Sequence, residues 1–230
     1  MPGVLLRADN LQSLSPDDIR TLVDDEGLEV VIDLRTDTEV RLEGPGPITA
    51  HPFVRIEHRS LYPDSGGNTD LDAAVKPWGH EDQDESPEES PLVRAYVSYL
   101  RRRPDSVVAS LRTIARCDGA VLVHCAAGKD RTGVVVALAL DAAGVDRDVI
   151  VSDYAATGER IDAILGRLLG SSTYRTELVG SDPEAHTPHP ELIERFLELV
   201  DDRLGGAAPW LARHGLDAAD LRRLRQRLAA

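Results

Sequence analysis

The stretch from Ala120 to Leu140 reads AVLVHCAAGKDRTGVVVALAL and decides how this part of the chain folds. Residues 120–124 are apolar up to His124, which is typical of a buried strand. Residues 132–140 are apolar almost all round, as expected of a helix buried against a sheet. The short loop around Gly128 therefore joins a strand to a helix, which is a unit of parallel sheets.

Strands alternate with helices in the rest of the chain. Short β-branched runs predict strands at residues 28–34 and 53–61. Capping residues, prolines and apolar spacing predict helices at residues 15–25, 91–103, 104–117, 146–158, 190–204 and 217–228. The order predicts an α/β fold with a central, mostly parallel sheet flanked by helices on both faces.

The chain has 230 residues, enough to form one domain with its own core, and we expect a single domain over residues 1–230. The C-terminal helices in residues 190–230 are expected to pack on that same domain. Residues 65–91 contain loop-forming residues and an acidic run. They predict either a flexible surface loop or a lid over a site.

Charge and composition disfavour several classes of partner. Forty acidic against 26 basic residues give a net charge of −14, which makes nucleic acids and anionic membrane surfaces poor partners. No apolar run approaches the roughly 18 residues of a membrane span, and no signal peptide is visible. We therefore expect no integral membrane association. Cys117 and Cys125 are expected to be free thiols of a cytoplasmic protein, while export without a signal peptide and the oligomeric state stay open.

The loop after His124 is suited to hold an anion, because its backbone N–H groups and those of the first helical turn lack carbonyl partners and the helix dipole adds positive potential. The same field stabilises the thiolate form of Cys125, which is the nucleophilic form. Arg131 can hold two oxygens of a phosphate group with its planar guanidinium. We expect Cys125 and Arg131 to be catalytic. The expected phosphate-binding residues are Cys125, Ala126, Ala127, Gly128, Lys129, Asp130 and Arg131.

This segment resembles a known active-site loop. The pattern Cys-x5-Arg-Thr-Gly, with His124 before it, is similar to the loop of the cysteine-based protein tyrosine phosphatases. The letters GKDRTG at residues 128–133 narrow the resemblance to a bacterial, especially actinobacterial, family that also shows phosphoinositide phosphatase activity. Residues 31–40, 145–154, 210–216 and 221–224 are also similar to that family. The likeness covers about residues 4–228, with 65–91 unmatched.

The resemblance implies the cysteine-based phosphatase fold and a protein tyrosine phosphatase that hydrolyses phosphomonoesters through a phosphocysteine intermediate. Phosphotyrosine proteins are the implied substrates, and a phosphoinositide or dual-specificity phosphatase is the alternative. We expect no cofactor and no metal, since the loop amides and Arg131 neutralise the phosphate charge. The Asn-Phe-Arg-Asp-type segment that usually precedes the position of Leu5 is missing, so we expect a trimmed edge of the fold or a misassigned start.

Two aspartates are candidates for the general acid that protonates the leaving group. Asp64 follows the second predicted strand and resembles the family's aromatic-Pro-Asp loop, although Pro-Asp-Ser-Gly is also ordinary turn chemistry. Asp130 lies inside the loop, where it either faces the leaving group or pairs with a basic group such as Arg35 and shapes the loop.

Several neighbours are expected to support the site. His124 is expected to order the loop by hydrogen bonding and to lower the pKa of the cysteine. Thr132 hydrogen-bonds the cysteine sulfur, and Asp33 and Arg35 support the loop from behind. Lys129 adds a second positive charge, which indicates either recognition of an inositol-type headgroup or a solvated surface lysine.

Other functions need a different set of residues. A catalytically silent phosphate-binding module predicts loss of the nucleophile or the arginine, and both are present. A sulfur- or arsenic-handling thiol enzyme does not need Arg-Thr-Gly at this spacing, and Cys117 is poorly placed as a resolving cysteine. His186 and His189, with a proline between them and no cysteine partners, are a weak metal signal.

Overall fold

The computed structural model describes residues 4–63, 88–180 and 186–229. Its centre is a four-stranded sheet in the order β1-β4-β2-β3, in which every pair of neighbours is parallel. The strands are β1 (Leu5–Ala8), β2 (Leu28–Asp33), β3 (Arg55–His58) and β4 (Ala120–His124). The fold class predicted from the sequence is confirmed.

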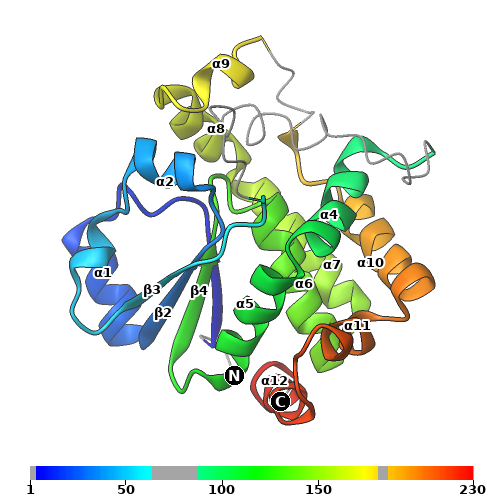
Figure 1. The fold of residues 1–230 in the computed structure, drawn as a ribbon. Coiled ribbons are helices and arrows are strands. Elements are labelled where there is room, and N and C mark those ends of the chain that lie inside the picture. The colour runs from blue at the N-terminus through cyan, green and yellow to red at the C-terminus, as the bar shows by residue number, and fades with distance from the viewer. Residues whose placement is uncertain (1–3, 64–87, 181–185, 230) are drawn as a thin grey trace.

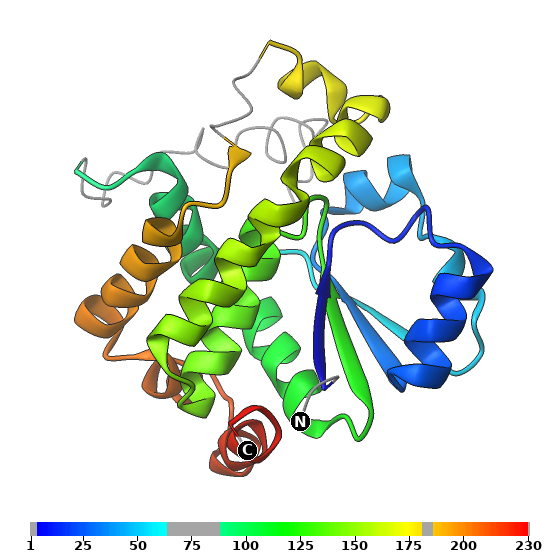
Figure 2. The ribbon, with the colours of Figure 1, turned by 180° about the vertical axis from the view of Figure 1, so that it is seen from behind.

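Helices cover both faces of this sheet (Figure 1). One face carries α1 (Pro16–Arg20), which continues as the π-helical turn η1 (Thr21–Asp25), and the 3-10 turn η2 (Pro47–Ala50). The other face carries α4 (Pro91–Arg102), α5 (Pro104–Arg116) and α6 (Asp130–Ala143). An outer layer beyond α6 is formed by α7 (Arg147–Ala155), α10 (Pro190–Leu204), α11 (Ala207–Arg213) and α12 (Ala218–Leu228). Figure 2 shows α7 and α10 side by side in that layer.

The alternation of side chains along the strands explains the two faces. Val121 and Val123 of β4 belong to the large core with α4, α5 and α6, whereas Leu122 between them packs with Ile19 and Leu22 on the opposite face. A strand that is apolar at every position is thus buried on both sides, as the sequence predicted.

The remaining helices lie beyond the carboxyl ends of the strands, at the top of Figure 1. They are α2 (Asp37–Glu43), the 3-10 turn η3 (Ala156–Arg160), α8 (Ile161–Gly170) and α9 (Arg175–Leu178). In parallel α/β sheets, ligands bind at this edge, because the loops that follow the strands converge there. Ala8 and Asp33 are both paired in register with His124, so the carboxyl ends of β1, β2 and β4 lie side by side at this edge.

The structure adds elements that the sequence analysis did not predict. These are β1, α2, α8, α9 and α11. The strand predicted at 53–61 is shorter, because Phe53 stands in a turn and is 80% exposed. The acidic segment at 65–91 lies outside the described residues, apart from its last four positions. Among the described residues, every helix is too short or too polar to cross a lipid bilayer.

Candidate active site

Cys125 begins the loop that joins β4 to α6, and its side chain is 2% exposed. The loop ends at Lys129, the N-cap residue of α6, which makes no side-chain hydrogen bond to the helix terminus. The first N–H groups of α6 are therefore available to an anion. Gly128 has φ +63°, and a Cβ there would collide with the backbone of Ala8, so only glycine permits this close path.

Arg131 in the first turn of α6 is held by a buried carboxylate. Its two terminal nitrogens lie 2.6 and 2.9 Å from the two oxygens of Glu39, a side chain on α2 that is 1% exposed. Burial opposes the charge of Arg131, but Glu39 and, less strongly, Cys125 raise the pKa of Arg131 well above its ordinary value. The guanidinium carbon also lies 5.6 Å from the ring centre of Tyr62. The arginine is thus fixed and charged.

Glu39 is itself positioned by two further groups. The Thr36 N–H donates to its Oε2 at 2.7 Å in a capping box at the start of α2, and the Tyr174 hydroxyl donates to its Oε1 at 3.1 Å. Burial works to raise the pKa of Glu39, but Arg131 and these hydrogen bonds lower it below its ordinary value. Glu39 lies within residues 31–40, and no role was predicted for it from the sequence. The Thr-x-x-Glu spacing was the available signal for the capping box.

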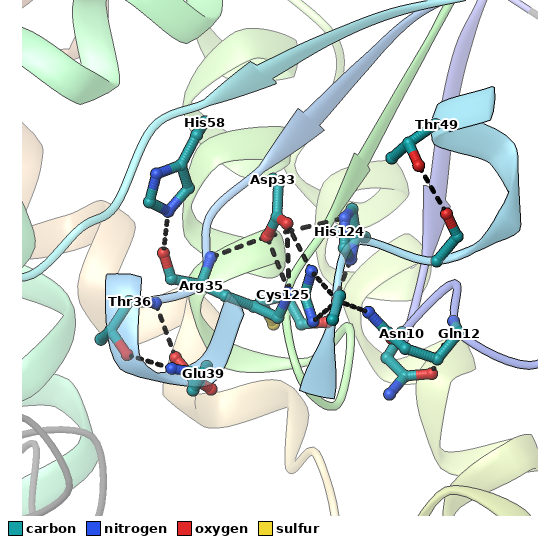
Figure 3. Close-up of polar contacts among 12 residues, drawn as sticks. Asn10, Gln12, Asp33, Arg35, Thr36, Glu39, Thr49, His58, His124 and Cys125 are labelled. Carbon is teal, nitrogen blue, oxygen red and sulfur yellow. Dashed lines mark hydrogen bonds and ion pairs between the residues drawn. The ribbon is translucent and has the colours of Figure 1, made fainter. Parts of the chain in front are cut away.

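Asp33, Arg35 and His124 form a buried polar group behind the cysteine (Figure 3). The guanidinium of Arg35 donates to both oxygens of Asp33, with contacts as short as 2.6 Å, and His124 Nε2 lies 3.6 Å from Asp33 Oδ1. Burial opposes ionisation of Asp33, but Arg35 and His124 together lower the pKa of Asp33. Burial lowers the pKa of His124 more than Asp33 raises it. His124 is therefore neutral at pH 7, and its Nδ1 lies 3.2 Å from the carbonyl oxygen of Cys125.

Asp130 does not pair with Arg35. Its Oδ1 accepts a hydrogen bond from the Tyr96 hydroxyl at 2.5 Å, and its Oδ2 lies 3.5 Å from the Lys129 ammonium. Tyr96 is in turn 2.8 Å from the Tyr154 hydroxyl, and burial raises the pKa of both tyrosines, so both remain protonated donors. The contacts with Tyr96 and Lys129 hold the carboxylate of Asp130 in a fixed orientation.

Lys129 is a buried residue. It is 5% exposed, and its ammonium donates to the carbonyl oxygen of His186 at 2.9 Å, between the loop and the segment that leads to α10. Thr132 is fully buried, and its Oγ1 has no hydrogen-bond partner among the described residues. The predicted hydrogen bond from Thr132 to the cysteine sulfur is therefore not formed here.

Asp64 is outside the described residues, so its role as the general acid stays a prediction. Cys117 follows α5, at the amino end of β4, and its sulfur lies 3.3 Å from Glu29 Oε2. Burial raises the pKa of the Cys117 thiol, which makes it a poor nucleophile. In the described part of the chain, no three His, Cys, Asp or Glu side chains come together as metal ligands.

A parallel α/β sheet that presents a cysteine and an arginine on one loop at a helix N-terminus defines a cysteine-based phosphatase. A model of the tyrosine phosphatase family matches residues 1–230, and the chain belongs to this family. It is therefore a phosphoric monoester hydrolase of the protein tyrosine phosphatase class, as the sequence predicted.

Two known proteins are similar to the chain. One is the triple specificity protein phosphatase PtpB of Mycobacterium tuberculosis, which is 29% identical over 255 residues, covering 97% of this chain and 90% of that protein. The other is a tyrosine-protein phosphatase of Nostoc commune, which is 32% identical over 146 residues, covering 60% of this chain and 49% of that protein.

The Glu39–Arg131 pair predicts a stability change. Glu39→Gln leaves the charge of Arg131 buried without its carboxylate, so we expect the free energy of unfolding at pH 7 to fall by about 3 kcal/mol. Since the pKa of Glu39 is lowered in the folded protein, its contribution is complete above the unfolded-state value of about 4.3 and is lost as the pH falls through the folded value. Urea unfolding checks this. A difference between the two proteins that grows with acidification would contradict the assignment.

Proposed function

We propose that this phosphatase hydrolyses phosphotyrosine in proteins through a phosphocysteine on Cys125. The observation that carries the proposal is the arrangement of one loop. Its cysteine stands at the carboxyl end of the central strand, and its arginine, six residues later, is fixed by a buried carboxylate at the start of a helix. The thiolate, the helical N–H groups and the guanidinium together match a nucleophile and its phosphate.

In the first step the Cys125 thiolate attacks phosphorus, an S–P bond forms, and the P–O bond to the tyrosine oxygen breaks. The leaving oxygen takes a proton from an aspartic acid. In the second step water attacks phosphorus, its proton passes to the aspartate, and the S–P bond breaks to release inorganic phosphate and the thiolate. Arg131 and the loop N–H groups hold the three equatorial oxygens in both steps. This scheme needs no metal or organic cofactor.

We propose Asp64 as the acid and Asp130 as a residue that shapes the loop. Asp130 already accepts from Tyr96 and faces Lys129, which supports an orienting role. Tyr62, two residues before Asp64 in the chain, lies against Arg131, which supports a place for Asp64 near the site. The Asp64 assignment otherwise rests on the resemblance of Tyr62-Pro63-Asp64 to the family's loop.

Paired asparagine variants distinguish the two aspartates. We expect Asp64→Asn to lower kcat on a phosphotyrosine peptide by about 100-fold, to flatten the basic limb of the pH profile, and to affect 4-nitrophenyl phosphate much less, because that leaving group needs little protonation. We expect Asp130→Asn to lower kcat/KM by about 10-fold on both substrates with the basic limb kept. If the two variants exchange these behaviours, Asp130 is the acid.

Substrate range is the second part of the proposal. Phosphotyrosine comes first, and the similarity to a protein named a triple specificity protein phosphatase supports a wider range. Phosphoinositides are the alternative that the resemblance of residues 128–133 implies. The Lys129 ammonium donates one hydrogen bond to the His186 carbonyl and the side chain is buried, so an inositol headgroup could use its remaining N–H donors only if this side chain became accessible. We place the activity in the cytoplasm on the basis of the free thiols.

A phosphate-release panel tests this range. Phosphotyrosine, phosphoserine and phosphothreonine peptides and each phosphoinositide are offered to the purified protein, with EDTA present throughout and Cys125→Ser as the blank. Release from phosphotyrosine alone fits a protein tyrosine phosphatase in which Lys129 supports the loop. Comparable release from phosphoinositides fits the dual-specificity alternative, and release from none of them fits the silent binding module.

A further inference from the structure

The outward-facing carbonyl groups of the phosphate-binding loop need hydrogen-bond donors. In a trans peptide the C=O of one residue points opposite to the N–H of the next residue. A loop that turns its N–H groups toward a phosphate must therefore turn its carbonyl oxygens to the other side. Such carbonyls are unpaired unless another part of the protein, or water, donates to them.

Two arginines from distant parts of the chain donate to these carbonyls. Arg7 on β1 donates through Nη2 to the carbonyl oxygen of Gly128 at 2.7 Å. Arg167 on α8 donates through Nη2 to the carbonyl oxygen of Ala126 at 2.5 Å. Neither is used in the mechanism above. They bind the first and third residues after Cys125, so they fix two separate peptide groups of the same loop.

Each arginine is anchored on its outer side. Arg7 also donates to the carboxylate of Asp153 at 2.8 Å and to the Thr157 hydroxyl at 3.0 Å. Arg167 donates to the carboxylate of Asp9 at 2.9 Å. These partners hold both guanidinium groups against the loop at the same time, so each arginine bridges the loop to a neighbouring element.

We propose that Arg7 and Arg167 are positioning residues of the phosphatase, which orient the 128–129 and 126–127 peptide groups so that the N–H groups of Lys129 and Ala127 face the phosphate. This inference deepens the proposed function and rests on it. It gives the short strand β1 and the helix α8, which the sequence analysis did not predict, a role in the reaction.

The site of these arginines allows the proposal to be tested in folded protein. Both side chains line a cavity of about 610 Å³ on the outer side of the loop, together with Asp9, Asp153 and Thr157. The side chains of Arg7 and Arg167 are 17% and 22% exposed, so truncation to alanine enlarges this cavity and leaves the apolar core intact. Arg147→Ala is the matched control, because Arg147 on α7 binds Asp141 and Asp201 at 2.8 Å each and these contacts are away from the loop.

The experiment measures kcat, KM, the inhibition constant of vanadate and the thermal midpoint for wild type, Arg7→Ala, Arg167→Ala and Arg147→Ala. We expect Arg7→Ala and Arg167→Ala each to lower kcat by about 10- to 100-fold and to weaken vanadate binding, at thermal midpoints close to that of Arg147→Ala. Arg167→Lys, which keeps a positively charged donor group, should have a higher kcat than Arg167→Ala.

Two outcomes would contradict the positioning role of Arg7 and Arg167. If both variants keep the kcat and the vanadate inhibition constant of the wild type, or if activity falls only in proportion to the folded fraction, the positioning role is wrong. Vanadate binding followed by calorimetry reports on the loop even without turnover. A wild-type protein that binds vanadate but releases no phosphate would refute the proposed function and would still allow the arginine variants to be judged by their affinity for vanadate.

Discussion

Replacing Cys125 by serine is expected to abolish phosphate release while leaving the fold and phosphate binding in place. An alcohol at this position is a far weaker nucleophile than a thiolate, so we expect kcat to fall by about 10⁴-fold or more. The substitution changes a single side-chain atom of a residue that is buried at the end of β4, so the thermal midpoint should change little.

The matched control is Cys117→Ser, which changes the other buried thiol at the far end of the same strand. It should keep wild-type kcat, because nothing near the reacting atoms changes. Hydrolysis of 4-nitrophenyl phosphate and vanadate binding are measured for both variants. Turnover by Cys125→Ser comparable to that of the wild type would show that Cys125 is not the nucleophile.

Replacing Arg131 by lysine is expected to lower kcat/KM by about 10³-fold, although the charge is kept. The guanidinium donates to both oxygens of Glu39 and still presents N–H groups in the same plane for two phosphate oxygens. An ammonium group has no such fork, so it cannot hold Glu39 and the equatorial oxygens together. Glu39 would then hold the ammonium away from the phosphate or lose its partner.

Arg195→Lys is the control for the chemical change itself, because Arg195 on α10 is likewise paired with carboxylates, those of Glu89 and Glu198. It should leave kcat/KM and the vanadate inhibition constant unchanged. If Arg131→Lys keeps most of its activity, charge alone is sufficient and the fork geometry has no role.

The sequence predicted the fold class and the central part of the site, because both depend on local patterns. An apolar strand that ends at His124, a glycine-containing loop and an apolar helix follow each other within residues 120–140, and Cys125 and Arg131 lie between the strand and the apolar part of the helix. Asp33 and Arg35 were placed behind the loop by resemblance, and the structure finds them buried beside His124. The short strand β1 was missed, because four residues that include an arginine form a strand only by pairing with β4.

The contacts that fix the loop could not be predicted, because they join residues far apart in the chain. Glu39 and Arg131 are 92 positions apart, and Arg167 is 41 positions from the Ala126 carbonyl that it binds. All of the 26 basic residues except Lys76 and Lys129 are arginines. Because arginine is so common in this chain, no local pattern distinguishes Arg7 or Arg167 from the others. Asp130 was open to several partners in the sequence, and only packing of α4 against α6 brings Tyr96 to it.

The central claim is that the phosphoryl group passes through the sulfur of Cys125. Rapid quenching of the wild-type protein during turnover, followed by mass spectrometry of its peptides, tests this claim most directly. The account predicts one phosphoryl group on the peptide that contains Cys125, absent from Cys125→Ser and lost as phosphate is released. A phosphoryl group on another side chain, or undiminished turnover after alkylation of Cys125, would contradict it.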